Sequence, residues 1–428
     1  MAFQYVRAHS NSGSSFLLIC IMINLLFLSR TVAPIATKPR HSLPFSRIDD
    51  HLRTLNKPAV KTIHSPDGDI IDCVPIHQQI ALDHPKLRNH KLQMHPQTQP
   101  SYGTAESVNR FTKMGRSNEI RQLWHENGRC PSATVAVRRI TAEDIRRVGS
   151  VERFGRKFHQ PPKPKPRSPK PKPRSRIVSR PGHEYATAYL DNNEYYGTRA
   201  TINVWNPHVQ GPLEFSVAQI WLAAGSFDNG DLNTIEVGWM VHPKYYGDNN
   251  TRLFTFWTDD AYQFTGCYNH DCLGFVQVSS EVALGASISP VSSDGGVQYE
   301  IQLMIWKDSV TRNWWLKFGN DAPMGYWPAE IFSHLSTAAT SIQWGGEILN
   351  FEISGQHTQT QMGSGNFAQA GSSHASYFKN IFYVNAANQL VFPTNLQTSV
   401  AFPNCYSIQV PNANSFYFGG PGRNSNCP

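Results

Sequence analysis

Two short segments of the sequence each place a glutamate beside glycine and tryptophan on a strand-like background. In the first, Glu236 alternates with large apolar residues and falls in the same set as Gly238; in the second, Glu347 falls in the same set as Gly345. Side chains of a strand point alternately to its two faces, so each glutamate is expected to share a face with a glycine and to have open space beside it. Two carboxylates in open grooves could perform acid–base hydrolysis, one donating a proton and one accepting it.

The same pattern has simpler interpretations. A glutamate on the outer face of an antiparallel strand is commonly only solvated, and a glycine within a strand often marks a β-bulge. The tryptophans beside the glutamates, Trp239 and Trp344, fall in the opposite set and are expected to point into the core. They are therefore not expected to contact a substrate.

The N-terminus of the 428-residue chain begins like a secretory precursor. Arg7 precedes an apolar run over residues 16–28, and the small residues Ala33 and Ala36 follow. The run is short for a membrane span, so we expect a signal peptide over residues 1–36 and no membrane segment after its removal. The expected location is extracellular, with the vacuole as the alternative, and Asn249 in Asn-Asn-Thr is the expected glycosylation site.

Seven cysteines are present, and Cys20 lies in the expected signal peptide. An even number in a secreted chain indicates disulfides. The spacing of the other six favours the pairs Cys73–Cys130, Cys267–Cys272 and Cys405–Cys427. Zinc binding around His270, between Cys267 and Cys272, is the alternative, but no second pair stands at zinc-finger spacing. No metal or cofactor is expected.

The net charge of +8 comes from one segment. Residues 161–180 contain eight lysines and arginines, no acidic residue, and two copies of Pro-Lys-Pro-Lys-Pro-Arg-Ser. Proline at nearly every second position predicts an extended polyproline II linker over residues 161–182. Contact with acidic cell-wall polymers is an alternative role for this cationic run. Nucleic acid is not an expected partner of a secreted chain.

The linker separates two regions of different composition. Residues 37–160 are predicted to form a small α+β region with little core, including a capped helix over residues 141–147. Residues 183–428 contain short aromatic and β-branched runs between turn signals and are predicted to form an all-β antiparallel sandwich. The expected strands are residues 199–205, 214–222, 234–241, 251–257, 274–278, 299–307, 313–318, 341–353 and 376–384. One helix is expected over residues 327–337, because Pro328 stands near its start.

The chain resembles the plant neprosin family, and the resemblance covers nearly everything except the signal and the linker. The resembling segments before the linker are residues 68–74, 83–85, 128–131 and 138–139. Those after it are residues 200–207, 219–221, 231–239, 246–248, 266–269, 344–347, 360–365 and 419–424. The Pro-Lys linker and residues 131–136 depart from the family pattern.

This resemblance implies a glutamic endopeptidase that cleaves after proline and is made as a zymogen. It implies an N-terminal activation domain that inhibits the enzyme, and proline-containing peptides or proteins as substrates. The family's catalytic pair carries over onto Glu236 and Glu347, and its catalytic-domain cysteines match Cys267, Cys272, Cys405 and Cys427.

Two close carboxylates resist simultaneous ionisation, so activity should favour acid. The sequence does not assign which glutamate is the acid and which the base. Two other functions fit the residues: a β-sandwich glycoside hydrolase that uses the same two carboxylates, and a non-enzymatic cell-wall-binding protein.

Overall fold

The structure is a computed structural model that describes residues 45–102, 120–157, 182–319, 323–351 and 355–428, all within one unit, Pro44–Pro428. The expected signal peptide and almost all of the expected linker lie outside the described residues. Among those described, no helix is both long and apolar enough to cross a membrane.

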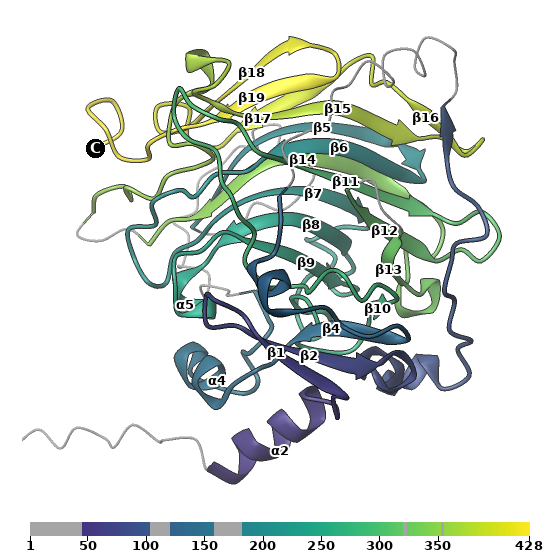
Figure 1. The fold of residues 1–428 in the computed structure, drawn as a ribbon. Coiled ribbons are helices and arrows are strands. Elements are labelled where there is room, and N and C mark those ends of the chain that lie inside the picture. Colours follow the sequence, from purple (N-terminus) through teal and green to yellow (C-terminus); the bar gives the residue numbers. More distant parts are fainter. Residues whose placement is uncertain (1–44, 103–119, 158–181, 320–322, 352–354) are drawn as a thin grey trace, which may run out of the picture. The chain divides into compact units, whose positions relative to one another are not determined.

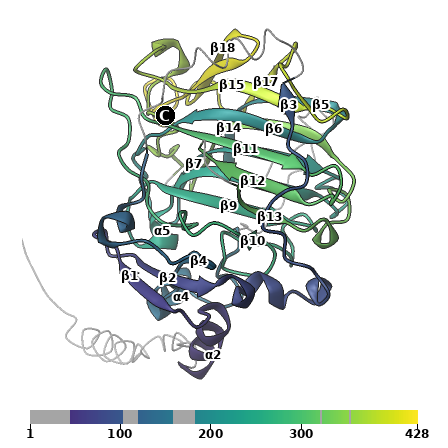
Figure 2. The same ribbon diagram turned by 45° about the vertical axis from the view of Figure 1, so that its right-hand side comes forward.

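Two large sheets lie face to face in the part of the chain after the linker (Figures 1 and 2). The strands of the first, antiparallel throughout, are in spatial order β17 (Gln397–Val400), β5 (His183–Tyr195), β14 (Ala339–Leu349), β7 (Ser216–Ala224), β8 (Asn233–Val241) and β9 (Arg252–Thr258). The second has the order β10 (Val276–Gln277), β13 (Pro323–Trp327), β12 (Trp314–Phe318), β11 (Glu300–Lys307), β6 (Gly197–Asn203), β15 (Ser376–Val384), β16 (Gln389–Val391) and β3 (Ser101–Tyr102). The hairpin of β18 (Ser407–Asn412) and β19 (Ser415–Gly419) joins the second sheet at β15.

The core lies between these two sheets and follows from strand alternation. Trp239 and Trp344 are fully buried in it, as expected. The indole nitrogen of Trp344 donates to Thr198 Oγ1 at 3.1 Å, and that of Trp239 donates to the carbonyl oxygen of Asn203 at 2.9 Å; both acceptors lie on β6 of the opposite sheet. Each large ring removed from water stabilises the sandwich by about 5 kcal/mol. The predicted antiparallel β-sandwich is therefore confirmed.

The region before the linker forms a small α+β unit packed near the β9 and β10 edges (Figures 1 and 2). Its sheet has the order β1 (Lys61–His64), β2 (Ile70–Pro75) and β4 (Thr134–Arg138), and its α-helices are α2 (Phe45–Leu55) and α4 (Ala142–Val148). The predicted cap of α4 is present, because Thr141 and Asp144 form a reciprocal capping box. Its small core is shared with the sandwich, since Ile71 and Trp124 cluster with Ala283 and Ala286. The region also supplies β3, which pairs in parallel with β16.

The helix predicted over residues 327–337 is wrong. Only the 3₁₀ turn η5 (Ala329–Ile331) forms there, and Phe332 is already extended. The carboxamide oxygen of Asn233 accepts hydrogen bonds from the backbone N–H groups of His334 and Leu335 at 2.8 and 3.1 Å. These side-chain bonds take the donors that a continuing helix would need.

The remaining short elements occur in connections. They are α5 (Pro243–Tyr246) and the 3₁₀ turns η1 (Ile76–Gln78), η2 (Ile80–Asp83), η3 (Pro85–Leu87), η4 (Leu123–Asn127) and η6 (Ala368–Ala370).

Candidate active site

The register of β8, β7 and β14 places both glutamates on the same face of the first sheet. Glu236 stands opposite Trp221 of β7, and Glu347 stands opposite Val217 of β7. Val217 and Trp221 are four residues apart, an even number, so both glutamates point to the same face of the sheet, the one away from the core. Along the strand direction they are separated by two same-face positions. Gln219 occupies the step between them.

Glycine is required beside the glutamates for a different reason from the open space that was expected. A Cβ at Gly238 would lie 2.0 Å from the carbonyl oxygen of Ala218, and a Cβ at Gly345 would lie 2.2 Å from that of Ala186. The neighbouring strand's backbone therefore excludes a side chain at both positions. Neither glycine lies at the register shift of β14, which falls between Ala339 and Ser341.

The expectation of open grooves beside the glutamates is wrong for this form of the protein. Glu236 is 0 % exposed and Glu347 is 1 % exposed. Lys157 fills the space. It lies at the end of the region before the linker (residues 37–160), the expected activation domain, which is called the activation region below. Its ammonium nitrogen forms an ion pair with Glu236 Oε2 and lies 3.8 Å from Glu347 Oε2. One cation thus lies within ion-pair distance of both carboxylates.

Glu236 is bound by hydroxyl groups as well as by the ammonium. Its Oε1 accepts hydrogen bonds from Tyr262 Oη at 2.8 Å and Thr234 Oγ1 at 2.9 Å. The ring centroids of Phe256 and Tyr262 lie 5.1 and 5.5 Å from the Lys157 nitrogen, a distance at which aromatic faces attract a cation.

Glu347 is bound by a different set of donors. The amide nitrogen of Gln219 donates to Oε2 at 2.7 Å, and Tyr185 Oη donates to Oε1 at 3.3 Å. His183 Nδ1 lies 2.5 Å from Oε1. His183 and Tyr185 belong to β5, the strand next to β14, so the first residues after the linker help to orient this carboxylate.

The segment that carries Lys157 docks on the loop closed by Cys267 and Cys272. The carbonyl oxygen of Gly155 accepts from the backbone N–H of Tyr268 at 2.8 Å, and Arg156 Nη1 donates to the carbonyl oxygen of Phe264 at 2.6 Å. Gly155 has a φ of +77°, and a Cβ there would lie 3.0 Å from the Cβ of Asp271. Glycine therefore permits both the turn and the close contact.

A buried ion pair also joins the activation region to the sandwich. Arg252 Nη1 of β9 lies 2.7 Å from Asp69 Oδ2, and Asp69 also pairs with Arg138. Burial alone would raise the pKa of Asp69, but the two guanidinium groups outweigh burial and lower it.

Asp271 is a buried acid next to the docked segment. Burial raises its pKa to about 7, although the hydrogen bond from Tyr245 Oη acts in the opposite direction. Tyr245 in turn stacks against Phe154 of the activation region, with ring centroids 5.5 Å apart.

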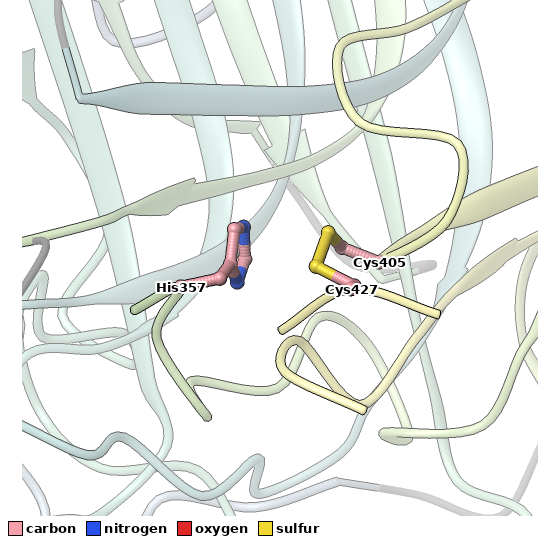
Figure 3. A group of neighbouring side chains, drawn as sticks. All are labelled: His357, Cys405 and Cys427. Carbon is pink, nitrogen blue, oxygen red and sulfur yellow. A yellow bond between two sulfur atoms is a disulfide. The ribbon is translucent and has the colours of Figure 1, made fainter. Parts of the chain in front are cut away.

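One cluster of histidine and cysteine side chains lies elsewhere, among the described residues, and Figure 3 shows it. Cys405 and Cys427 form a disulfide, so their sulfur atoms are not thiolate ligands. His357 Nε2 binds Glu184 at 2.8 Å, and its Nδ1 lies 2.8 Å from the carbonyl oxygen of Thr358. The groups that could hold a metal are already used, so the cluster is structural.

The other sequence-predicted residues lie apart from the glutamate pair or support it indirectly. The structure joins Cys73 to Cys130, Cys267 to Cys272 and Cys405 to Cys427, the pairs that the spacing favoured. The Cys267–Cys272 bridge leaves no thiolate for the alternative zinc site. Asn249 is exposed in the loop that precedes β9.

Several residues that surround the glutamates were not predicted from the sequence. Gln219 lies in one of the family-like segments and shares strand parity with the glutamates, so its position could have been found. Lys157, His183, Tyr185 and Tyr262 carry no periodic or motif signal.

Comparisons with known proteins find two family models along the chain. The family model Neprosin matches residues 212–421, and the model Neprosin activation peptide matches residues 62–189. An activation-peptide domain implies that this part of the chain inhibits the rest.

Similar solved structures include Scytalido-glutamic peptidase with a peptide-based transition state analog, at 14% identity and a TM-score of 0.32, over 55% of this chain and 97% of that chain. Another is SCP-B, a member of the Eqolisin family of peptidases, in a complex with the tripeptide Ala-Ile-His, at 14% identity and a TM-score of 0.30, over 55% of this chain and 96% of that chain.

Proposed function

Because the chain belongs to the neprosin family, we propose that it is a glutamic endopeptidase made as a zymogen. It hydrolyses peptide bonds on the C-terminal side of proline at acidic pH, with Glu236 and Glu347 as the catalytic pair.

The position of Lys157 carries the proposal. Two glutamates from β8 and β14 converge on one ammonium that the activation region supplies. A cation held in this way offsets the charge of the carboxylates and occupies the space where a water and a scissile carbonyl would have to bind. The same contact therefore explains why two carboxylates tolerate burial together and how the precursor remains inactive.

The hydrogen bonds support different roles for the two glutamates. The neighbours of Glu347 include an amide N–H, a phenol and an imidazole, and hydrogen bonds donated to a carboxylate favour its ionised form. Glu347 is therefore the base that takes a proton from the attacking water. Apart from Lys157, Glu236 contacts hydroxyl groups of Thr234 and Tyr262, which can accept as well as donate, so it can carry a proton once Lys157 leaves.

In this mechanism the water oxygen attacks the scissile carbonyl carbon while its proton moves to Glu347. Glu236 first polarises the carbonyl oxygen, and the proton taken up by the pair then passes to the leaving nitrogen as the C–N bond breaks. The rings of Phe256 and Tyr262, which flank Lys157 in the precursor, can pack against the ring of a substrate proline after Lys157 is released.

The test incubates the full chain, brought to about pH 4, with a proline-containing peptide and separately with glucans. Glu236→Gln and Glu347→Gln keep the side-chain shape but remove acid–base chemistry, so each should lower peptide hydrolysis at least 100-fold. Glu330→Gln, at an exposed carboxylate on η5, is the matched control and should keep wild-type activity. Circular dichroism and thermal unfolding check that the variants fold.

Three results would overturn the assignment. Either glutamine variant with wild-type activity would exclude the pair, sugar release alone would indicate a glycoside hydrolase, and no turnover at all would favour a wall-binding protein.

We further propose that residues 1–36 direct the chain into the secretory pathway and that Asn249 is glycosylated. Expression in a eukaryotic secretory host should release protein whose mobility increases after removal of N-glycans, and Asn249→Gln should abolish that change.

A further inference from the structure

A pocket of about 510 Å³ continues the face that carries the two glutamates. Three of its lining residues, Asp191 on β5, Ser341 on β14 and Ala223 on β7, are register partners across these strands. The next step on the same face contains Trp221 of β7, whose β8 partner is Glu236. Residues two apart on a strand are separated by about 6.7 Å, so the pocket begins about one such step beyond Glu236.

A substrate that runs along the strand direction past Glu236 would reach the pocket. A bound peptide in extended conformation advances about 3.3 Å per residue. A side chain two to three residues from the cleaved bond can therefore reach the pocket while the bond itself lies between Glu236 and Glu347.

The lining determines which side chain fits. Asp191 and Glu194 are its charged residues, and the others are neutral: Asn192, Asn193, Ala223, Gly225, Leu232, Thr340 and Ser341. Asp191 Oδ1 accepts hydrogen bonds from Asn192 at 2.7 Å and Gln397 at 3.4 Å, and Glu194 Oε2 accepts one from Tyr196 at 2.9 Å. Neither carboxylate forms an ion pair with a described residue, so the net charge of the lining is negative.

A second, independent observation indicates the same ligand chemistry. The part of this face that is filled in the precursor holds a lysine, Lys157, whose ammonium lies against the carboxylates and aromatic rings there. The face therefore already accommodates a basic side chain about one step from the pocket.

We propose that this pocket is a substrate subsite that binds a lysine or arginine two to three residues from the cleaved bond. The inference rests on the proposed peptidase function and adds a preference for basic sequences near proline. The chain's own residues 161–180, with lysine or arginine next to nearly every proline, have the composition that such a subsite selects. The linker is in this sense a matched substrate for self-processing.

The test compares two proline-containing peptides that differ at one position, two residues from the bond cleaved after proline. One peptide has lysine at this position and the other has methionine. The full chain is first brought to about pH 4 until its activity is constant, and kcat/KM is then measured at about pH 5, above the ordinary pKa range of carboxyl groups. The lysine peptide should be preferred about fivefold, which corresponds to about 1 kcal/mol. A second pair of peptides places the variable residue on the other side of the bond.

The double variant Asp191→Asn with Glu194→Gln should reduce the lysine-to-methionine ratio to about one. Asp294→Asn, at an exposed carboxylate that pairs with His374 on another loop, is the matched control and should keep the wild-type ratio.

Cleavage of both peptides by the wild-type protein without a preference in either pair would overturn the subsite while leaving the peptidase intact. A preference that survives in the double variant would also overturn it. Failure of the wild-type protein to cleave any of these peptides would instead refute the peptidase function, and the subsite with it.

Discussion

Replacement of Lys157 by methionine tests whether this one side chain keeps the precursor inactive. Methionine retains most of the apolar stem but removes the ammonium, which lies over the ring of Phe256 and within ion-pair distance of both carboxylates. Glu236 and Glu347 would then be buried without that ammonium. The docked segment should leave the face more readily, and the unprocessed precursor should hydrolyse peptides.

The size of the effect follows from burial. The side chains of Lys157, Glu236 and Glu347 are at most 3 % exposed, so solvent screens their interaction very little. Removing one partner of a buried ion pair costs about 3 to 5 kcal/mol. At about 4 kcal/mol, the equilibrium between the docked and released segment shifts by roughly three orders of magnitude. If the whole unit Pro44–Pro428 unfolds together, the same loss lowers Tm by about 5 °C.

The assay uses the precursor with Lys157→Met and follows peptide cleavage and chain length together. Activity should appear at about pH 5 while the chain is still uncleaved, and the Tm deficit should be larger at pH 7.5 than at pH 4, where one carboxyl can take up a proton. Lys57→Met is the control, because Lys57 pairs with a half-exposed Asp83 and its loss should cost under about 1 kcal/mol. A Lys157→Met precursor as inert and as stable as the control would refute the reasoning.

Three further predictions concern acid and processing. Asp271→Asn should raise Tm at pH 7.5 by a few degrees and have little effect near pH 4, because a carboxyl with a folded pKa of about 7 destabilises the fold as pH rises from about 4 to 7; thermal scans across that range check it. His90→Gln should lower the pH at which the activation region is released, measured by the pH midpoint of activation, since burial lowers the pKa of His90 in the docked form. N-termini that appear in acid should follow prolines of residues 161–181 and be absent in Glu236→Gln, as peptide sequencing would show; an intact precursor would contradict self-processing.

Strand parity was sufficient to place the glutamates but not to describe their surroundings. The alternation around Glu236 and Glu347 put both on the face away from the core, and the register of β7 shows that they share it. Parity contains no information on what covers that face. Lys157 is 79 residues from Glu236 in the sequence, and His183 is 164 residues from Glu347, so only the tertiary fold brings them together.

The missed elements have physical reasons of the same kind. β5 was not expected because polar residues near its end, such as Asp191 and Asn192, interrupt the apolar alternation, yet pairing with β14 and β17 satisfies its backbone. β13 begins at Pro323 and contains Gly325, both unfavourable in strands, but it is held between β12 and β10. Tertiary pairing overrode local propensity in both strands.

We expect histidines of the activation region to make its docking sensitive to acid. His90 Nε2 lies 2.8 Å from Tyr326 Oη of β13, and His125 Nε2 lies 2.8 Å from the carbonyl oxygen of Glu281. Burial lowers the pKa of both, and the nearby Arg129 lowers that of His125 further. The docked form therefore binds fewer protons than the released form, and docking becomes less favourable as pH falls below about 6.5.

Asp69 and Asp271 extend this argument to lower pH with opposite signs. The pKa of Asp69 is lowered by Arg252 and Arg138, so its contribution is complete above the ordinary carboxyl range and is lost as pH falls through the lowered value. The raised pKa of Asp271 makes the buried form more stable as pH falls from about 7 to about 4, which opposes release if docking of Gly155 contributes to that burial. Below about pH 6.5 the histidines therefore favour release and Asp271 opposes it, whereas at lower pH the loss of the Asp69–Arg252 pair adds to release. A release profile with two steps, of which Asp69→Asn removes the lower, follows from these signs; a single step unchanged in that variant would show that the ion pair does not hold the activation region in place.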